Sequence, residues 1–145
     1  MQSFIYPATL IPEDEGGIVV KFTDMPEAIT QGEDVQDALR EAADCLEEAV
    51  ANRIVMGLPI PKPSPIIEGW CTPVLLPAQM AAKAALYVAI GEAKISKTEL
   101  ARRLHCDEKE VRRLLDPRHP SKLPRIESAL AAVGQKLVVG LQAAV

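Results

Sequence analysis

Alternation between apolar and polar positions predicts three short strands in the first third of the chain. Successive side chains of a strand point to opposite faces, so a period of two marks a strand with one covered face. This period runs through Ser3–Ile11, Ile18–Thr23 and Ala28–Gln31. The connecting stretches PEDEGG and DMPE contain proline, glycine and acidic residues, which favour a hairpin loop and a tight turn.

A helical period replaces the period of two after Gly32 and predicts one long helix. Asp34 suits the N-cap position, and Gly57 suits the end of the helix. Apolar residues recur at helical spacing and form the expected inner face: Val35, Ala38, Leu39, Ala42, Leu46, Ala49, Val50 and Ile54. The opposite face is acidic and consists of Asp37, Glu41, Asp44, Glu47 and Glu48.

Proline stands at every second position from 59 to 65, which predicts an extended, polyproline-like conformation for residues 58–65. Ile66–Leu76 then supplies a last strand. We expect this strand at a sheet edge, because Pro73 cannot donate a hydrogen bond to a neighbour. Residues 1–76 are therefore predicted to form a β-β-β-α-β domain.

Residues 77–145 have the pattern of an all-α domain, so the fold class of the whole chain is predicted as α+β. Pro77 suits the first turn of a helix, and AQMAAKAALYVAIGEA is rich in helix formers. Further helices follow as far as IESALAAVGQ. The tail 136–145 is ambiguous between strand and helix, and it is a candidate contact between copies of the chain.

Residues 96–115, SKTELARRLHCDEKEVRRLL, predict two short helices joined by a tight turn. Ser96 and Glu99 match a capping box, and DEKE repeats a similar pattern before the second helix. Ala101 is small, as required where two crossing helices approach closely. His105 occupies the turn, where glycine is common, but histidine tolerates a left-handed backbone better than most residues. This spacing is that of a helix-turn-helix.

The helix-turn-helix interpretation assigns DNA contacts to polar side chains of this motif and of the loop after it. Cations on the outer face of the second helix would reach phosphates or guanine edges in the major groove. The candidates are Lys97, Thr98, Glu108, Lys109, Arg112, Arg113, Arg118 and Lys122. The alternative is a helical hairpin with a solvated basic face. Because such motifs normally act in pairs, we expect a homodimer or a higher even oligomer.

Net charge changes sign between the two predicted domains. Residues 1–76 carry a formal charge of −9 and residues 77–145 a charge of +5, which suggests oppositely charged partners. The three cysteines lie far apart without a CxxC or His/Cys cluster, so we expect no zinc site, no disulfide framework and no cofactor. No secretory signal and no apolar stretch of membrane-spanning length is visible. A cytoplasmic protein without a membrane partner is therefore expected.

Both halves together resemble the HicB family of antitoxins. The resemblance rests on YPATLIPEDEGGIVVKFTDMPEAITQGEDVQDALREAADCLEEAV, on the proline run, and on KTELARRLHCDEKEVRRLL. It implies that the N-terminal domain is a partial RNase H-like fold without nuclease activity, which masks a small basic mRNA-cleaving toxin of the HicA type. It also implies that the C-terminal domain binds operator DNA and that antitoxin and toxin together repress their own operon.

The acidic helix face, Asp37, Glu41, Asp44, Glu47 and Glu48, is the candidate toxin-binding surface, because complementary potentials steer a basic partner towards it. A merely solvated helix face is one alternative interpretation. Contacts through a sheet edge or the hairpin are another route to the toxin.

Two further functions compete with the antitoxin interpretation. A nuclease would need several carboxylates that converge on divalent ions, but the first three predicted strands contain none. Asp24 and Glu27 flank Pro26 in a turn, so we expect no catalytic residue and no metal site. The second is a stand-alone helix-turn-helix regulator with a ligand- or protein-binding N-terminal domain, although no Gly-rich phosphate loop supports a small ligand.

Overall fold

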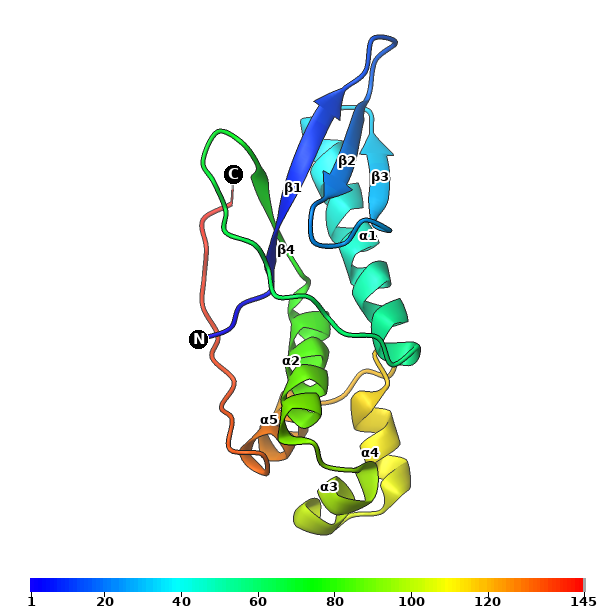
Figure 1. Cartoon of the computed structure of the whole chain (residues 1–145), viewed down its shortest axis with the longest axis vertical. Coiled ribbons are helices and arrows are strands. Elements are labelled where there is room, and N and C mark those ends of the chain that lie inside the picture. The colour runs from blue at the N-terminus through cyan, green and yellow to red at the C-terminus, as the bar shows by residue number, and fades with distance from the viewer. Residues whose placement is uncertain (145) are drawn as a thin grey trace. The chain divides into compact units, whose positions relative to one another are not determined.

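The structure, a computed structural model, describes residues 1–144 and has mixed α+β character (Figure 1). The described residues contain one four-stranded sheet and five helices. The chain divides into two compact units, one formed by Met1–Ala81 and one that begins at Ala82. The two units are described separately.

The sheet of the first unit is antiparallel throughout, with the strand order β3-β2-β1-β4. Its strands are β1 (Ile5–Pro12), β2 (Ile18–Phe22), β3 (Ile29–Gly32) and β4 (Thr72–Leu75). The first three predicted strands are confirmed, with ends shifted by one or two residues.

The fourth strand is shorter than the predicted Ile66–Leu76. The backbone N–H groups of Trp70 and Cys71 donate to the carbonyl of Ile67 over 3.1 and 3.2 Å. Gly69 lies between Ile67 and Trp70 and has φ +83°, a left-handed conformation that glycine adopts without steric penalty. A turn therefore occupies the first part of the predicted strand, and pairing begins only at Thr72.

Two prolines face each other between β1 and β4. The register pairs Pro7 with Pro73, and neither residue has an N–H to donate. Residue pairs in an antiparallel ladder alternate between hydrogen-bonded and non-hydrogen-bonded pairs. The two prolines form a non-hydrogen-bonded pair, and the pairs on either side of them are hydrogen-bonded. The vacant donor position of Pro73 consequently faces the free edge of β4, in agreement with the edge placement expected from the sequence.

Helix α1 (Val35–Val55) packs against β3 and β2 (Figure 1). Its N-cap Asp34 accepts a hydrogen bond from the N–H of Asp37 over 2.8 Å, as its position predicts. A Cβ atom at Gly32 would lie 2.3 Å from the backbone nitrogen of Ala38, so only glycine allows β3 and α1 to approach this closely.

The core of this unit is mainly aliphatic and lies between α1 and the sheet. Six residues of α1 are buried: Ala38, Ala42, Leu46, Val50, Ala51 and Ile54. The sheet and its turns contribute buried side chains that include Tyr6, Val20, Phe22, Met25 and Val74. Val35, expected on the inner face, is instead 53% exposed, because it lies in the first turn of the helix.

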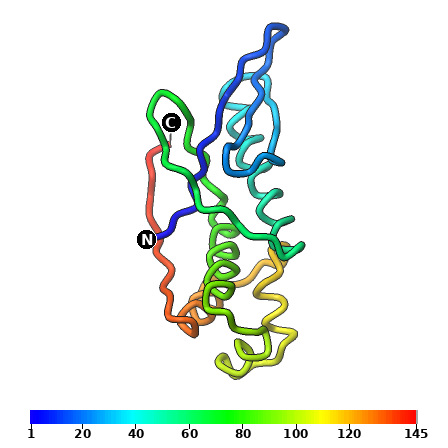
Figure 2. Tube along the Cα trace, in the orientation of Figure 1, coloured from blue at the N-terminus to red at the C-terminus, as the bar shows by residue number. Residues whose placement is uncertain are grey.

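The Pro-rich segment 58–65 contains neither helix nor strand (Figure 2). Side chains of the first unit hold it in place. The Tyr6 hydroxyl donates to the carbonyl of Pro61 over 2.7 Å. Arg53 donates to the carbonyl of Pro59 over 2.8 Å, and Asp24 accepts from the N–H and the hydroxyl of Ser64. The segment is therefore bound to the rest of the first unit by hydrogen bonds.

Four helices make up most of the rest of the chain: α2 (Ala78–Ala93), α3 (Lys97–Leu104), α4 (Glu108–Leu115) and α5 (Leu123–Ala131). The core of the second unit is built from buried side chains of all four, among them Leu86, Leu100, Val111, Leu114, Ile126 and Leu130. Residues 136–144 form neither strand nor helix. Val145 of the predicted tail lies outside the described residues.

Candidate functional site

Helices α3 and α4 are joined by a turn of three residues, 105–107. His105 ends α3 in the left-handed conformation, with φ 54° and ψ 43°, which confirms the tolerance expected of histidine there. The N–H of Cys106 then donates back to the carbonyl of Ala101 over 3.0 Å and closes the end of the helix. This geometry allows the chain to reverse direction between the two helices within a single short turn.

Both helix starts are capped by the predicted side chains. Ser96 accepts from the N–H of Glu99 over 3.0 Å, and Asp107 accepts from the N–H of Glu110 over 2.9 Å. Each cap satisfies one backbone donor that a helix start otherwise leaves free. The two caps therefore fix where α3 and α4 begin.

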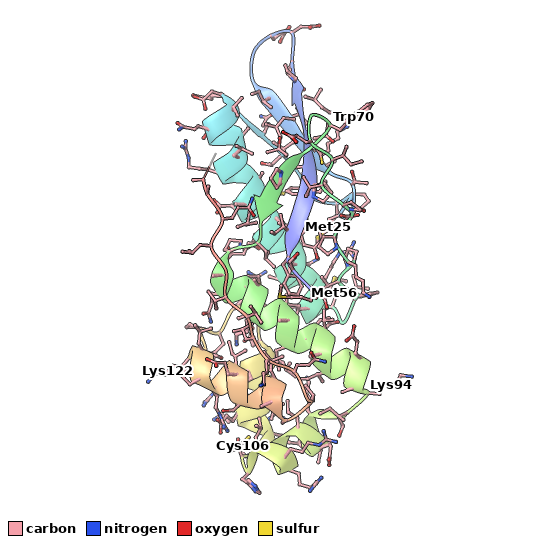
Figure 3. The ribbon with its side chains drawn as sticks, turned by 90° about the vertical axis from the view of Figure 1, so that its left-hand side faces the viewer. Met25, Met56, Trp70, Lys94, Cys106 and Lys122 are labelled. Atoms are coloured by element: carbon pink, nitrogen blue, oxygen red, sulfur yellow. The ribbon has the colours of Figure 1, made fainter. Side chains whose placement is uncertain are left out.

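The inner and outer faces of α4 are clearly separated. Val111 and Leu114 are buried in the core of the second unit. Glu108, Lys109, Arg112 and Arg113 are exposed on the other side, as the sequence predicts. Lys97 and Thr98 at the start of α3, and Arg118 and Lys122 after α4, are also exposed; Figure 3 labels Lys122 at the start of α5.

Three of the predicted DNA-contacting residues form a chain of interactions with one another. The Thr98 hydroxyl donates to a carboxylate oxygen of Glu108 over 2.5 Å. The other oxygen of Glu108 lies 3.7 Å from a guanidinium nitrogen of Arg112. Glu108 thus ties the start of α3 to α4 and holds the Arg112 side chain, a role that the sequence did not reveal.

Two arginines of α3 share one neighbouring carboxylate. Glu99 accepts from Arg102 over 2.6 and 2.8 Å and from Arg103 over 2.9 Å. The hydrogen bonds from Arg102, and secondarily from Arg103, lower the pKa of Glu99 to about 2. Glu99 therefore remains ionised, and it offsets one of the two positive charges of this cluster.

A hollow of about 620 Å³ lies between α4, the following loop and the first turn of α5. Its walls include five basic side chains: Lys109, Arg113, His119, Lys122 and Arg125. Arg125 is paired with Glu110 over 2.5 Å, whereas no ion pair involves Lys109, Arg113 or Lys122 among residues 1–144. These three cations are available to an anionic partner.

Lys83 of α2 is the one buried charged side chain among the described residues, with 2% of its surface exposed. Its ammonium donates to the carbonyls of Arg113 and Leu114 over 3.0 and 2.8 Å, and to the Ser121 hydroxyl over 2.7 Å. Burial lowers the pKa of Lys83 to about 8, although the carboxylate of Asp116 acts in the opposite direction. In the sequence this lysine is visible only as an interruption of an apolar stretch.

The candidate toxin-binding residues lie on α1, and they differ in their surroundings. Glu41, Asp44 and Glu48 are exposed, and Glu47 is half-buried. Asp37 has local partners, since it accepts from the N–H of Glu33 over 2.8 Å and from Arg40 over 3.1 Å. The exposed acidic surface is therefore formed mainly by the middle of the helix.

The turn carboxylates of the first unit hold other parts of the same unit. Asp24 fastens Ser64, and Glu27 pairs with Arg53 over 2.6 and 3.0 Å. The Arg53 guanidinium lowers the pKa of Glu27. Within residues 1–144 no group of three or more His, Cys, Asp or Glu side chains is placed to hold a metal ion. No helix over the same range is long and apolar enough to cross a membrane.

Comparison with known proteins identifies the family. A model of HicB-like antitoxins of bacterial toxin–antitoxin systems matches residues 5–85. Antitoxin HicB of Escherichia coli strain K12 is 37% identical over 91% of this chain and 95% of its own length. Antitoxin HicB 1 of Photorhabdus laumondii is 34% identical over 94% and 86%, and antitoxin HicB of Pseudomonas fluorescens is 31% identical over 92% and 92%.

The matched relatives carry the name of an antitoxin, which is a non-enzymatic role and agrees with the expectation that this chain has no catalytic activity. The chain belongs to the HicB-like antitoxins of bacterial toxin–antitoxin systems.

Proposed function

We propose that this antitoxin binds and neutralises a small, basic, mRNA-cleaving toxin of the HicA type and represses its own operon by binding operator DNA. The toxin-binding function is assigned to residues 1–76, as a partial RNase H-like domain, and the DNA-binding function to residues 77–145. The observation that carries the DNA-binding part is the pair of capped helices α3 and α4, with Lys109 and Arg113 exposed on the outer face of α4 without an ion pair among residues 1–144.

In this proposal α3 and α4 are a helix-turn-helix, and α4 enters the major groove of the operator. Arg112 and Arg113 are in the last turn of α4 and Lys109 in the first, so they reach base edges or flanking phosphates. Lys97, Arg118 and Lys122 bind the phosphate backbone on either side. Glu108, held by Thr98, orients Arg112 before DNA arrives.

In the same proposal the toxin binds through the acidic surface of the first unit. The formal charge of −9 on residues 1–76 favours association with a protein whose own surface binds RNA. Glu41, Asp44 and Glu48 offer exposed carboxylates from one stable helix, with Glu47 and Asp37 beside them. Covering the RNA-binding surface of the toxin is enough to neutralise it, so no chemistry is required of the antitoxin.

A homodimer or a higher even oligomer completes the proposal. Two copies of a helix-turn-helix on successive turns of DNA double the number of contacts and match the symmetry of an operator. Within the tail, Val138, Val139 and Leu141 are 65%, 80% and 104% exposed, which makes residues 136–144 a candidate contact between copies.

The proposal is tested with two binding measurements on the intact protein. Co-expression with the small basic protein encoded beside its gene should give a complex that co-purifies and stops RNA cleavage by that protein. A DNA fragment from upstream of the gene should bind more tightly than a scrambled fragment, with an affinity that falls as salt rises. The proposal is abandoned if the protein neither binds its neighbour's product nor distinguishes the two fragments.

A further inference from the structure

We propose that Lys83 is a positioning residue for DNA recognition, which fixes the end of α4 and the loop after it in the geometry that the operator requires. This inference rests on the proposed DNA-binding function and goes beyond it, because Lys83 is buried and touches no DNA itself. It assigns a role to a residue of α2, outside the two helices of the motif.

The contacts of the ammonium are with the end of α4 and with the loop that follows. The carbonyls of Arg113 and Leu114 belong to the last turn of α4, where a helix no longer supplies its regular N–H partners. The Arg113 carbonyl also accepts from the N–H of Asp116 over 3.2 Å, and Lys83 adds a second donor to it. A positive charge at this end also complements the negative end of the helix dipole. Lys83 therefore acts as a cap delivered from another helix.

The third contact connects the cap to the loop. Lys83 donates to the hydroxyl of Ser121, one residue before Lys122. Asp116 organises the start of the same loop, since its side chain accepts from the N–H of Arg118 and its carbonyl accepts from the N–H of His119. One nitrogen atom thus sets the distance between the end of α4 and the residue that precedes Lys122.

Burying an ammonium group at this position costs free energy, because the charge leaves water. The surrounding core is apolar, and apolar side chains of similar size often replace buried charges without loss of stability. What the ammonium adds is direction, because its three N–H donors match three acceptors that lie on two separate segments. An apolar side chain would fill the same space and leave the angle between α4 and the loop unspecified.

Short elements make this restraint matter. Helix α4 has eight residues and cannot keep its shape without contacts to the rest of the unit. Its outer face carries Arg112 and Arg113, and the loop carries Arg118 and Lys122. Recognition of the base sequence of the DNA therefore depends on the distance between these two groups of side chains. A misplaced group still meets the uniform phosphate backbone but misses particular base edges.

The test compares Lys83→Met with two control variants in the full-length protein. Lys83→Met keeps the length of the side chain and removes its charge and donors. Leu86→Ala removes a buried side chain from the same helix and controls for lost stability. Arg113→Ala removes a proposed DNA contact. The probes are the DNA fragment upstream of the gene and a scrambled fragment of equal length, titrated at several salt concentrations with each variant shown to be folded by circular dichroism.

We expect Lys83→Met to lower the preference for the upstream fragment over the scrambled fragment by roughly tenfold. Its affinity for the scrambled fragment and its salt dependence should match the wild type, because Lys83 neutralises no phosphate. Arg113→Ala should instead lower the slope of log affinity against log salt by about 1 if it contacts a phosphate. Leu86→Ala should leave the preference unchanged.

The positioning role is overturned if Lys83→Met keeps the wild-type preference, or if Leu86→Ala loses as much preference as Lys83→Met. If Lys83→Met does not fold, Ser121→Ala takes its place, because it removes the hydroxyl that accepts from Lys83 and keeps the lysine and its two backbone acceptors. A reduced preference in Ser121→Ala supports the inference, and an unchanged preference overturns it. If the wild type itself shows no preference for the upstream fragment, the proposed operator binding and this inference are both wrong. If the wild type shows the preference but Lys83→Met and Leu86→Ala have equal preferences, only this inference is wrong.

Discussion

The Tyr6 side chain shows how a single residue can connect distant parts of the first unit. It is fully buried, and its hydroxyl donates to the Pro61 carbonyl, 55 residues away along the chain. Burial, with a further contribution from the nearby Asp24 carboxylate, raises the pKa of Tyr6 to about 12. The hydroxyl is therefore protonated, and able to donate, over the whole physiological pH range.

Tyr6→Phe should destabilise the first unit, because the carbonyl of Pro61 would lose its partner while the ring still packs. A buried acceptor without a partner costs about 1–3 kcal/mol. Urea denaturation followed by circular dichroism measures the free energy of unfolding of the variant and the wild type. A difference below about 0.3 kcal/mol would show that water replaces the hydroxyl and that this bond does not hold the segment.

The lowered pKa of Lys83 makes the free energy of unfolding depend on pH, and this dependence can be assigned to a single group. Its pKa is about 8 in the folded protein and returns to its ordinary value of 10.5 on unfolding, so between these values the unfolded chain binds more protons. The contribution of Lys83 to the free energy of unfolding therefore rises from pH 8 to pH 10.5 and is lost as pH falls back through 8. The difference in unfolding free energy between the wild type and Lys83→Met should increase over this window. A constant difference from pH 7 to 10 would contradict the lowered pKa.

At the scale of single elements, the two faces of α4 have separate tasks. Val111 and Leu114 hold the helix in the core, and the side chains of Arg112 and Arg113 are exposed on the outer face. Substitutions on the outer face should therefore change DNA binding without changing the fold.

Arg112→Ala combined with Arg113→Ala should weaken binding to the upstream DNA fragment and leave toxin neutralisation unchanged. Each lost base contact costs about 1–3 kcal/mol of discrimination. Gel shift at fixed salt and an RNA-cleavage assay with the toxin measure the two activities side by side. Equal loss of both activities would argue against separate DNA-binding and toxin-binding surfaces.

Helix and strand boundaries were predictable from the sequence where the residues that determine them are close together along the chain. The caps at Asp34, Ser96 and Asp107 lie within three residues of the N–H groups that they accept from, and all three were correctly placed. Strand β4 was predicted too long, because apolar residues around Gly69 satisfy the strand pattern although the backbone there turns.

Contacts between remote residues were not predictable in the same way. The bonds of Lys83 to Ser121 and of Asp24 to Ser64 span 38 and 40 residues. No periodicity connects such positions, and a lysine in an apolar helix looks the same whether it points to solvent or into the core. The sequence therefore placed the candidate DNA-binding surface on α4 but could not identify what supports it.

At the scale of the whole molecule, charge is divided between the two halves, and the proposal uses each half for a partner of opposite charge. Charge reversal at Glu41→Lys and Asp44→Lys should weaken toxin binding by about tenfold or more, because like charges across an interface repel. Binding to the upstream DNA fragment should change much less. The affinity for the toxin is measured by titration calorimetry.

Glu13→Lys with Asp14→Lys provides the matched control for charge reversal. These residues are exposed in the loop between β1 and β2, and the change in net charge is the same. If the control weakens toxin binding as much as the α1 variant, the effect belongs to the overall field of the domain or to a contact through the hairpin, and the acidic face of α1 is not the specific contact surface.

The facing prolines of β1 and β4 have a consequence for how the protein behaves in a crowded solution. A sheet with a bare edge invites strands of other chains to join it, which is a first step towards aggregation. Pro73 removes a donor from the outer edge of β4, and the strand is only four residues long. Both features disfavour growth of the sheet on this side, so β4 is a poor template for pairing with a strand of another copy.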